Sequence, residues 1–107
     1  MAAVNLNAKQ FENYLKEGTA FLVDYWAPWC SYCRRIGPAY EKVAEEYAGT
    51  LVVSKLNIDE EPLIAQAEHI EVIPTLVLYK GGHAVASIVA PESKAAIEGF
   101  IEENLGK

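Results

Sequence analysis

The segment Phe21-Leu22-Val23-Asp24-Tyr25-Trp26 constrains the fold more than any other stretch, because it is apolar almost without interruption. A nearly continuous apolar run is typical of a central strand that is covered on both faces. Pro28 breaks the chain directly afterwards, and a helical pattern begins near Ser31. We therefore expect a buried strand that leads into a helix, as in a β-α-β unit.

The remaining chain continues the alternation of strands and helices. Further strands are predicted at about 51–58, 75–79 and 84–89, and helices at about 6–17, 31–47, 59–68 and 93–105. The expected N-caps are Asn7, Asp59 and Ser93, and the expected stops are Gly18, Gly49 and Gly106. The early β-α-β units imply parallel strands, whereas the late Gly81-Gly82 hairpin adds antiparallel ones. The complete predicted order, β-α-β-α-β-α-β-β-α, indicates an α/β fold with a central mixed sheet of about five strands flanked by four helices on both faces.

Composition narrows the function classes. With 107 residues, 51% of them hydrophobic, the chain is expected to form one domain over residues 1–107 rather than a disordered segment. A net charge of −6 argues against partners with an anionic surface, so we expect neither nucleic acid nor membrane binding. The first residues lack the basic start and apolar core of a secretory signal, which predicts a cytoplasmic protein.

The strongest chemical signal is the pair Cys30 and Cys33, at the point where the predicted strand gives way to a helix. Cys30 is expected at the helix N-terminus, where unpaired backbone N–H groups and the helix dipole favour a thiolate. Cys33 follows one turn later on the same face, within reach of a disulfide. An activated thiol beside a second thiol is the requirement for thiol–disulfide exchange.

Three plainer interpretations of the pair stay open. A structural crosslink over so short a loop would stabilise the fold by only about 2 kcal/mol in the chain-entropy model. A zinc site needs two further ligands, and His69 and His83 stand too far apart in sequence for a compact half-site. The two cysteines could also be unrelated. We expect no metal and no cofactor.

From about Asn5 to Leu105 the chain resembles the thioredoxin family. The matching stretches are Val23-Asp24-Tyr25-Trp26-Ala27-Pro28-Trp29-Cys30, Lys55-Leu56-Asn57-Ile58-Asp59, Ile73-Pro74-Thr75-Leu76 and Lys80-Gly81-Gly82. The resemblance implies a protein-disulfide reductase in which Cys30 is the nucleophile and Cys33 the resolving thiol.

The resemblance also implies a proton acceptor beneath the cysteines. Asp24 is expected to take the proton of Cys33, with Lys55 as its charged neighbour on the adjacent strand. A lone carboxylate in a buried strand loses its hydration, which raises its pKa. The alternatives are a structural, hydrogen-bonded Asp24 and an ordinary exposed strand lysine at Lys55.

A substrate-binding surface is implied around the cysteines. In the family the peptide corresponding to Ile73–Pro74 is cis and lies against the disulfide, and the backbone of Ile73 could pair with an extended substrate chain. Trp26 is expected to pack in the core. The predicted substrate-binding residues are Trp29, Ser31, Tyr32, Ile73, Pro74 and Ala90.

Two residues between the cysteines depart from the family pattern. Ser31-Tyr32 stands where Gly-Pro is usual, and Tyr32 carries a backbone N–H that proline lacks. That donor near Cys30, together with the charges of Arg34 and Arg35, should stabilise the thiolate and hence the reduced form. We expect a potential of roughly −210 to −240 mV, less reducing than the value of about −270 mV for thioredoxin.

Other departures lie in the surrounding loops. Ala90, followed by Pro91, replaces a glycine near the active site, and His69 is expected to act as a left-handed cap. Arg34 and Arg35 are either solvated charges or a patch for an acidic partner.

The leading prediction is therefore a monomer that reduces protein disulfides and whose own disulfide is reduced again by a thioredoxin reductase or an equivalent electron donor. An oxidase or isomerase uses the same chemistry with a less reducing motif. A binding module with incidental thiols is a different class, and the intact Cys30, Cys33, Asp24 and Trp29 argue against it.

Overall fold

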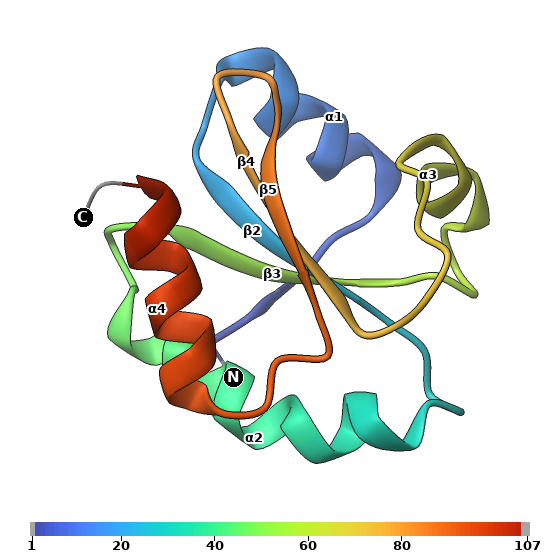
Figure 1. The fold of residues 1–107 in the computed structure, drawn as a ribbon. Coiled ribbons are helices and arrows are strands. Elements are labelled where there is room, and N and C mark those ends of the chain that lie inside the picture. Colours follow the sequence, from blue (N-terminus) through green and yellow to red (C-terminus); the bar gives the residue numbers. More distant parts are fainter. Residues whose placement is uncertain (1, 106–107) are drawn as a thin grey trace.

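Nine elements follow one another along residues 2–105, the part of the chain that the computed structural model describes (Figure 1). The strands are β1 (Val4–Asn5), β2 (Phe21–Trp26), β3 (Val52–Asn57), β4 (Thr75–Lys80) and β5 (His83–Val89). The helices are α1 (Ala8–Glu17), α2 (Ser31–Glu46), α3 (Pro62–Ala67) and α4 (Lys94–Leu105). The order of elements is the one that the sequence predicts.

One mixed sheet with the strand order β1-β3-β2-β4-β5 joins all five strands. β2 is its centre, parallel to β3 and antiparallel to β4, and all but its last residue are buried. The register places Asp24 beside Lys55 on β3 and Leu76 on β4. The predicted mixed sheet is thus confirmed, and its most apolar strand takes the position with a neighbour on each side.

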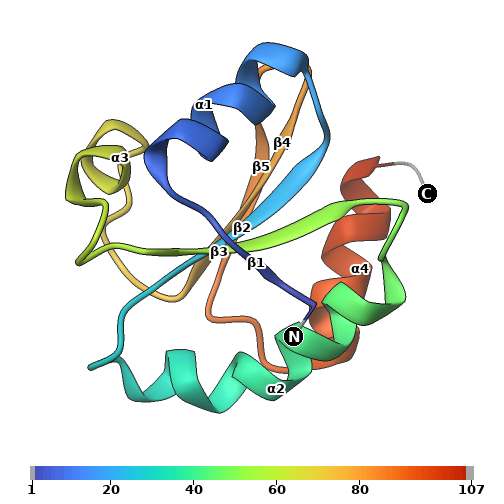
Figure 2. The same cartoon turned by 180° about the vertical axis from the view of Figure 1, so that it is seen from behind.

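Helices cover both faces of the sheet (Figures 1 and 2). α2 and α4 pack on one face around Leu22, Leu76 and Leu78, while α1 and α3 lie on the other, around Phe21 and Tyr25. Each face is held by the stripe of apolar residues that the helical spacing predicts. The fully buried side chains of this interior are Tyr25, Tyr40, Tyr79, Phe21, Leu22, Leu56, Leu76, Leu78, Ile97, Ile101, Val23 and Val43.

The helix ends follow local capping chemistry, with one correction. The Asn7 side chain accepts a hydrogen bond from the Gln10 N–H in a capping box, and Ser93 Oγ accepts one from Ala96 N–H, as predicted. The predicted cap Asp59 is wrong, because the N-cap of α3 is Glu61, without a side-chain cap. Asn57 instead organises this turn: its side chain accepts from the Asp59 N–H, which delays the helix to Pro62.

Positive φ angles appear where the sequence predicts them. Gly81 and Gly82 form the β4–β5 turn at φ 66° and 90°, and His69 takes the left-handed conformation at φ 60°. A Cβ on Gly82 would lie 3.2 Å from the Leu15 carbonyl oxygen of α1. The predicted stop Gly106 lies outside the described residues. Between residues 2 and 105, no helix is long and apolar enough to cross a membrane.

Candidate active site

Cys30 and Cys33 form a disulfide at the junction of β2 and α2, with their Cα atoms 5.3 Å apart. Cys30 is the N-cap residue of α2, as predicted, and both cysteines are buried. The Cys30 sulfur accepts a hydrogen bond from the backbone N–H of Cys33 at 3.2 Å. The expectation that Tyr32 supplies this donor is therefore wrong, because in the capping geometry the third helical N–H reaches the cap side chain.

Asp24 lies beneath this disulfide in the middle of β2 and is 2% exposed. Its Oδ1 has no hydrogen-bond partner among residues 2–105. Burial raises the pKa of Asp24 from 3.8 to about 7, and the positive charge of Lys55 opposes the rise. A carboxyl group with this pKa changes its charge near neutral pH.

A small cavity of about 230 Å³ connects Asp24 with Cys33. Besides Asp24 and Cys33, it is lined by Trp26, Arg34, Gly37, Tyr40, Glu41 and Lys55. The charged side chains of Asp24, Arg34, Glu41 and Lys55 interrupt an otherwise largely apolar lining, so a water molecule in this cavity would have hydrogen-bond partners.

Lys55 stands next to Asp24 in the register, as the sequence predicts. Its ammonium nitrogen lies 4.5 Å from the centre of the Trp26 ring, a cation–π contact. Trp26 is only half-buried and packs under this lysine, so the prediction of a core tryptophan holds in part. The tryptophan keeps the lysine stem folded over the cavity.

A buried polar pair behind Asp24 was not predicted. The Tyr40 hydroxyl on α2 donates to the Ser54 carbonyl oxygen at 2.6 Å, and Ser54 Oγ donates to the Leu22 carbonyl oxygen at 2.6 Å. Burial, and secondarily the negative charge of Asp24, hold the pKa of Tyr40 well above its usual value. Tyr40 therefore stays neutral, and the only clue in the sequence was a tyrosine on the buried helix face.

The Ile73–Pro74 peptide is cis, and the Ile73 carbonyl oxygen lies 3.9 Å from the Cys30 sulfur. Pro74 is buried and its carbonyl oxygen accepts a hydrogen bond from Ala90 N–H at 2.9 Å. Ala90 has φ 46°, the left-handed conformation that glycine adopts most easily. The cis peptide and the position of Ala90 near the active site agree with what the resemblance implies, whereas the hydrogen bond between Ala90 and Pro74 was not predicted.

Two aromatic side chains flank the sulfurs. Trp29 is 65% exposed, and its indole N–H donates to Asp59 Oδ2 at 3.1 Å. The half-buried Tyr32 extends in another direction, where its hydroxyl donates to the Pro91 carbonyl oxygen at 2.8 Å. The structure thus gathers Trp29, Tyr32, Ile73, Pro74 and Ala90 around the disulfide, while Ser31 is exposed at the start of α2.

Metal ligands do not gather in this region. Within residues 2–105, no group of three or more His, Cys, Asp and Glu side chains is placed to hold a metal ion.

A disulfide that caps a helix after a central strand, with a cis-proline against it and a buried carboxyl group beneath it, defines a thiol–disulfide oxidoreductase of the thioredoxin fold. Comparisons with known proteins agree. The Thioredoxin family profile matches residues 2–103, and the chain belongs to the thioredoxin family. Its segment Cys30-Ser31-Tyr32-Cys33 is of the Cys-x-x-Cys type.

Several bacterial relatives are similar over most of their length. The chain is 44% identical over 91 residues to thioredoxin of Acidithiobacillus ferridurans, covering 85% of this chain and 84% of that one. It is 41% identical over 103 residues to thioredoxin of Pseudomonas aeruginosa, covering 95% of each. A mutant thioredoxin from Halobacterium salinarum superposes with a TM-score of 0.83 at 26% identity, over 95% of this chain and 89% of that one.

Proposed function

We propose that this protein reduces disulfides of other proteins, with Cys30 as the nucleophile and Cys33 as the resolving thiol. The observation that carries the proposal is the position of Cys30 as the N-cap of α2, with the Cys33 N–H directed at its sulfur. A hydrogen bond to sulfur at the positive end of a helix favours the thiolate over the thiol. Cys33 lies deeper and faces the cavity above Asp24.

The reaction proceeds in two exchanges. The Cys30 thiolate attacks one sulfur of the substrate disulfide, which forms a mixed disulfide and releases the other substrate sulfur as a thiolate. Cys33 then loses its proton and attacks the Cys30 sulfur, which frees the second substrate thiolate and closes the Cys30–Cys33 disulfide. The substrate gains two electrons, and the protein dithiol loses them.

Asp24 is proposed as the acceptor of the Cys33 proton, and Lys55 as the charge that keeps Asp24 available for it. A carboxyl group with a pKa of about 7 can accept and return a proton near neutral pH. The cavity of about 230 Å³ that both side chains line gives the proton a way out. Because Asp24 and Cys33 line the same cavity, one water molecule can link them.

The substrate chain is proposed to bind along Ile73 and Pro74. The Ile73 carbonyl oxygen faces Cys30, so an extended substrate that pairs with this backbone brings its own sulfur close to the nucleophile. The exposed ring of Trp29 offers an apolar contact on one side. Ser31, Tyr32 and Ala90 bound the remaining surface.

We propose that residues 1–107 form a single domain that acts as a monomer in the cytoplasm. A thioredoxin reductase or an equivalent electron donor would reduce its disulfide after each reaction. A reducing compartment is where such a cycle runs in the reducing direction. The relatives named above carry the name thioredoxin, which supports this cycle. We further propose a potential less negative than about −270 mV.

Insulin reduction tests the proposal. Protein with dithiothreitol as the electron donor should precipitate the reduced insulin chain faster than dithiothreitol alone, and Cys30→Ser should abolish the acceleration. A wild-type rate equal to the background, with two thiols titrated in the reduced protein, would favour a binding module instead.

A further inference from the structure

The charges of α2 run against the helix dipole. Arg34 and Arg35 lie in its first turns, whereas Glu45 and Glu46 lie in its last, and its first turn carries no acidic residue. A helix is stabilised by acidic residues at its N-terminus and basic residues at its C-terminus, so this arrangement is unfavourable for folding. Departures of this kind from local stability are expected at functional positions.

The two arginines border an open hollow of about 420 Å³ beside the redox pair, lined by Ser31, Tyr32, Arg34 and Arg35. Two of the side chains that line it already form hydrogen bonds within the protein. Arg34 Nη1 donates to the Pro28 carbonyl oxygen at 2.8 Å, and the Tyr32 hydroxyl donates to Pro91. Arg35 and Ser31 are exposed, and neither side chain has a hydrogen-bond or ion-pair partner within residues 2–105.

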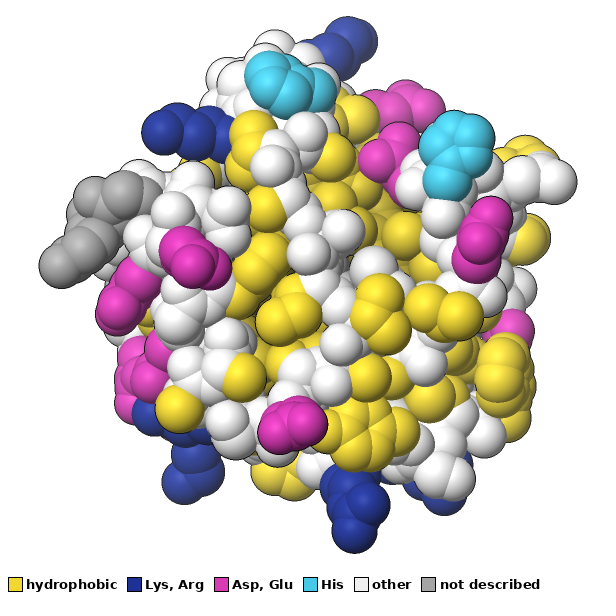
Figure 3. All heavy atoms as spheres, viewed as in Figure 1, with side chains coloured by type: hydrophobic (Ala, Val, Ile, Leu, Met, Phe, Trp, Pro, Cys, Tyr) yellow, Lys and Arg dark blue, Asp and Glu magenta, His cyan; other side chains and the backbone are white. Residues whose placement is uncertain are grey.

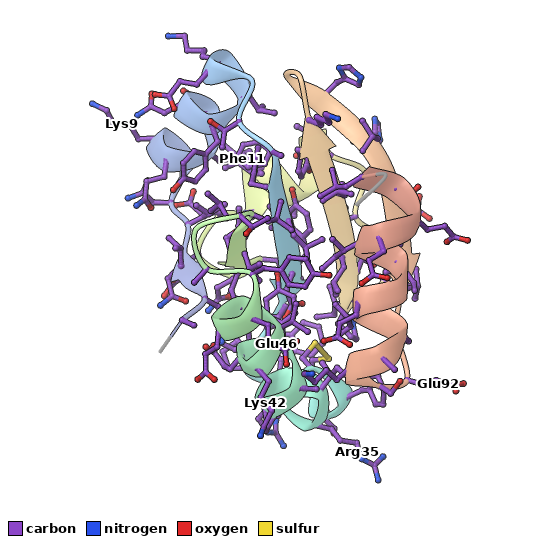
Figure 4. All side chains as sticks on the ribbon, turned by 90° about the vertical axis from the view of Figure 1, so that its left-hand side faces the viewer. Lys9, Phe11, Arg35, Lys42, Glu46 and Glu92 are labelled. Atoms are coloured by element: carbon purple, nitrogen blue, oxygen red, sulfur yellow. A yellow bond between two sulfur atoms is a disulfide. The ribbon has the colours of Figure 1, made fainter. Side chains whose placement is uncertain are left out.

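Arg35 forms no ion pair with an acidic side chain within residues 2–105. Figure 4 shows Arg35 projecting from α2 into solvent, while Glu92 projects from the loop before α4 in a different direction. The ion pairs formed among residues 2–105 join Lys94 to Glu46 and Glu98, away from this hollow. Figure 3 shows Lys and Arg side chains along the lower edge of this face, below a surface on which apolar side chains alternate with polar groups and with Asp and Glu side chains.

We propose that this cationic hollow, formed by Ser31, Tyr32, Arg34 and Arg35, is a docking surface for an acidic segment of the substrate protein beside its disulfide. The proposal deepens the function above and rests on it. Its ligand is a carboxylate of Asp or Glu, because guanidinium groups pair with carboxylates and the Ser31 hydroxyl can donate to the same group. On a chain with a net charge of −6, this local positive charge selects acidic over basic substrates.

The distance between Arg35 and Cys30 determines where the acidic residue must lie relative to the cysteine of the substrate. Arg35 lies five positions beyond Cys30, about 7 Å along the helix axis. An extended chain advances about 3.3 Å per residue, so we place the acidic residue about two positions from the attacked cysteine, at a separation that the long side chain of Arg35 can span.

The test compares two synthetic peptides, each closed by one disulfide and identical except for Asp or Lys at the second position from each cysteine. The probe is single-turnover reduction of each peptide by the reduced wild-type protein at low salt. We expect the acidic peptide to be reduced about three to ten times faster, with most of the difference lost in about 1 M salt, where the screening length is about 3 Å.

Charge reversal locates the effect. Arg35→Glu should remove or invert the preference, and it should speed the reduction of the basic peptide, which a change in thiolate reactivity alone would not do. Arg35→Lys should keep the preference. Lys42→Glu is the matched control, because it makes the same charge change on the same helix, about 18 Å along the axis from Cys30.

Equal rates for both peptides would overturn the docking surface and leave the reductase proposal intact. An equal loss of preference in Arg35→Glu and Lys42→Glu would also overturn it, since net charge rather than the hollow would then decide. Reduction of neither peptide would instead show that the proposed thiol–disulfide exchange fails.

Discussion

The Tyr32 hydroxyl donates a hydrogen bond to the Pro91 carbonyl oxygen at 2.8 Å, which joins the first turn of α2 to the loop between β5 and α4. On the other side of the same loop, Ala90 N–H donates to the Pro74 carbonyl oxygen. The redox helix, the loop and the cis-proline segment are therefore connected in series around the disulfide. Tyr32 thus holds in place a wall of the proposed substrate site.

Tyr32→Phe should lower the free energy of unfolding of the oxidised protein by about 0.5–1.5 kcal/mol, the usual contribution of one hydrogen bond. The ring stays, so only the hydroxyl contact with Pro91 is lost. Urea unfolding measures the change. Tyr14→Phe is the control, because Tyr14 is also partly buried and its hydroxyl has no hydrogen-bond partner within residues 2–105. Equal effects of both substitutions would contradict a stabilising Tyr32–Pro91 contact.

Variants of the two cysteines should differ in whether they accumulate a mixed disulfide with the substrate. Cys30→Ser should abolish exchange, because the sulfur that caps α2 is gone. Cys33→Ser should keep the first attack and accumulate a mixed disulfide, since no resolving thiol remains. Mass spectrometry of the trapped conjugates distinguishes them. Substrate conjugates recovered from Cys30→Ser would reverse the assignment.

Asp24→Asn should stabilise the oxidised fold at and above neutral pH by on the order of 4 kcal/mol. The folded pKa of Asp24 is about 7 against 3.8 without burial, so between these values the unfolded chain ionises first. Wild-type stability is therefore lost as pH rises from about 4 to about 7, and Asn removes that loss. Denaturant unfolding at several pH values measures it.

The exposed carboxylate Glu12 on α1 supplies the control, because Glu12→Gln leaves the pH profile unchanged when Asp24 alone is responsible. In the wild type, release of substrate from the mixed disulfide should accelerate as pH rises through about 7, where Asp24 becomes able to take a proton. An Asp24→Asn variant that is less stable than the wild type at pH 8, with an unchanged release rate, would contradict the proton-acceptor role.

The redox potential should lie between roughly −210 and −240 mV, measured by equilibration with glutathione. The hydrogen bond to the Cys30 sulfur comes from the Cys33 N–H, which does not depend on the residue at position 32. The expected shift therefore rests on the charges of Arg34 and Arg35 and on the unpaired N–H that Tyr32, unlike proline, adds to the first turn of the helix. Tyr32→Pro should therefore make the potential more negative, whereas Tyr32→Phe, which keeps the N–H, should not. A wild-type potential at or below about −270 mV would refute the expectation.

Local patterns were sufficient to predict most of the fold. The apolar run at 21–26 predicted the central strand, because a strand with a neighbour on each side and helices on both faces has no polar face to show. Asn7 and Ser93 predicted helix starts through contacts only three residues long. The prediction of Asp59 as an N-cap was wrong because another short-range contact competes with it: the Asn57 side chain accepts a hydrogen bond from the Asp59 N–H.

The features of the site also fall into two groups: those that local sequence predicts and those that depend on tertiary packing. The sequence by itself determined the Cys30–Cys33 pair, its place at a helix start and the carboxyl group of Asp24 within an apolar strand, because each is a short-range feature of the chain. Only the tertiary structure decided what these groups meet. Ile73 arrives at Cys30 and Pro91 at Tyr32 from segments far along the chain, through packing that no local spacing encodes. The cavity above Asp24 exists for the same physical reason: it is the space left where β2, β3 and α2 pack together, and burial at that place, opposed by the charge of Lys55, raises the pKa of the carboxyl group.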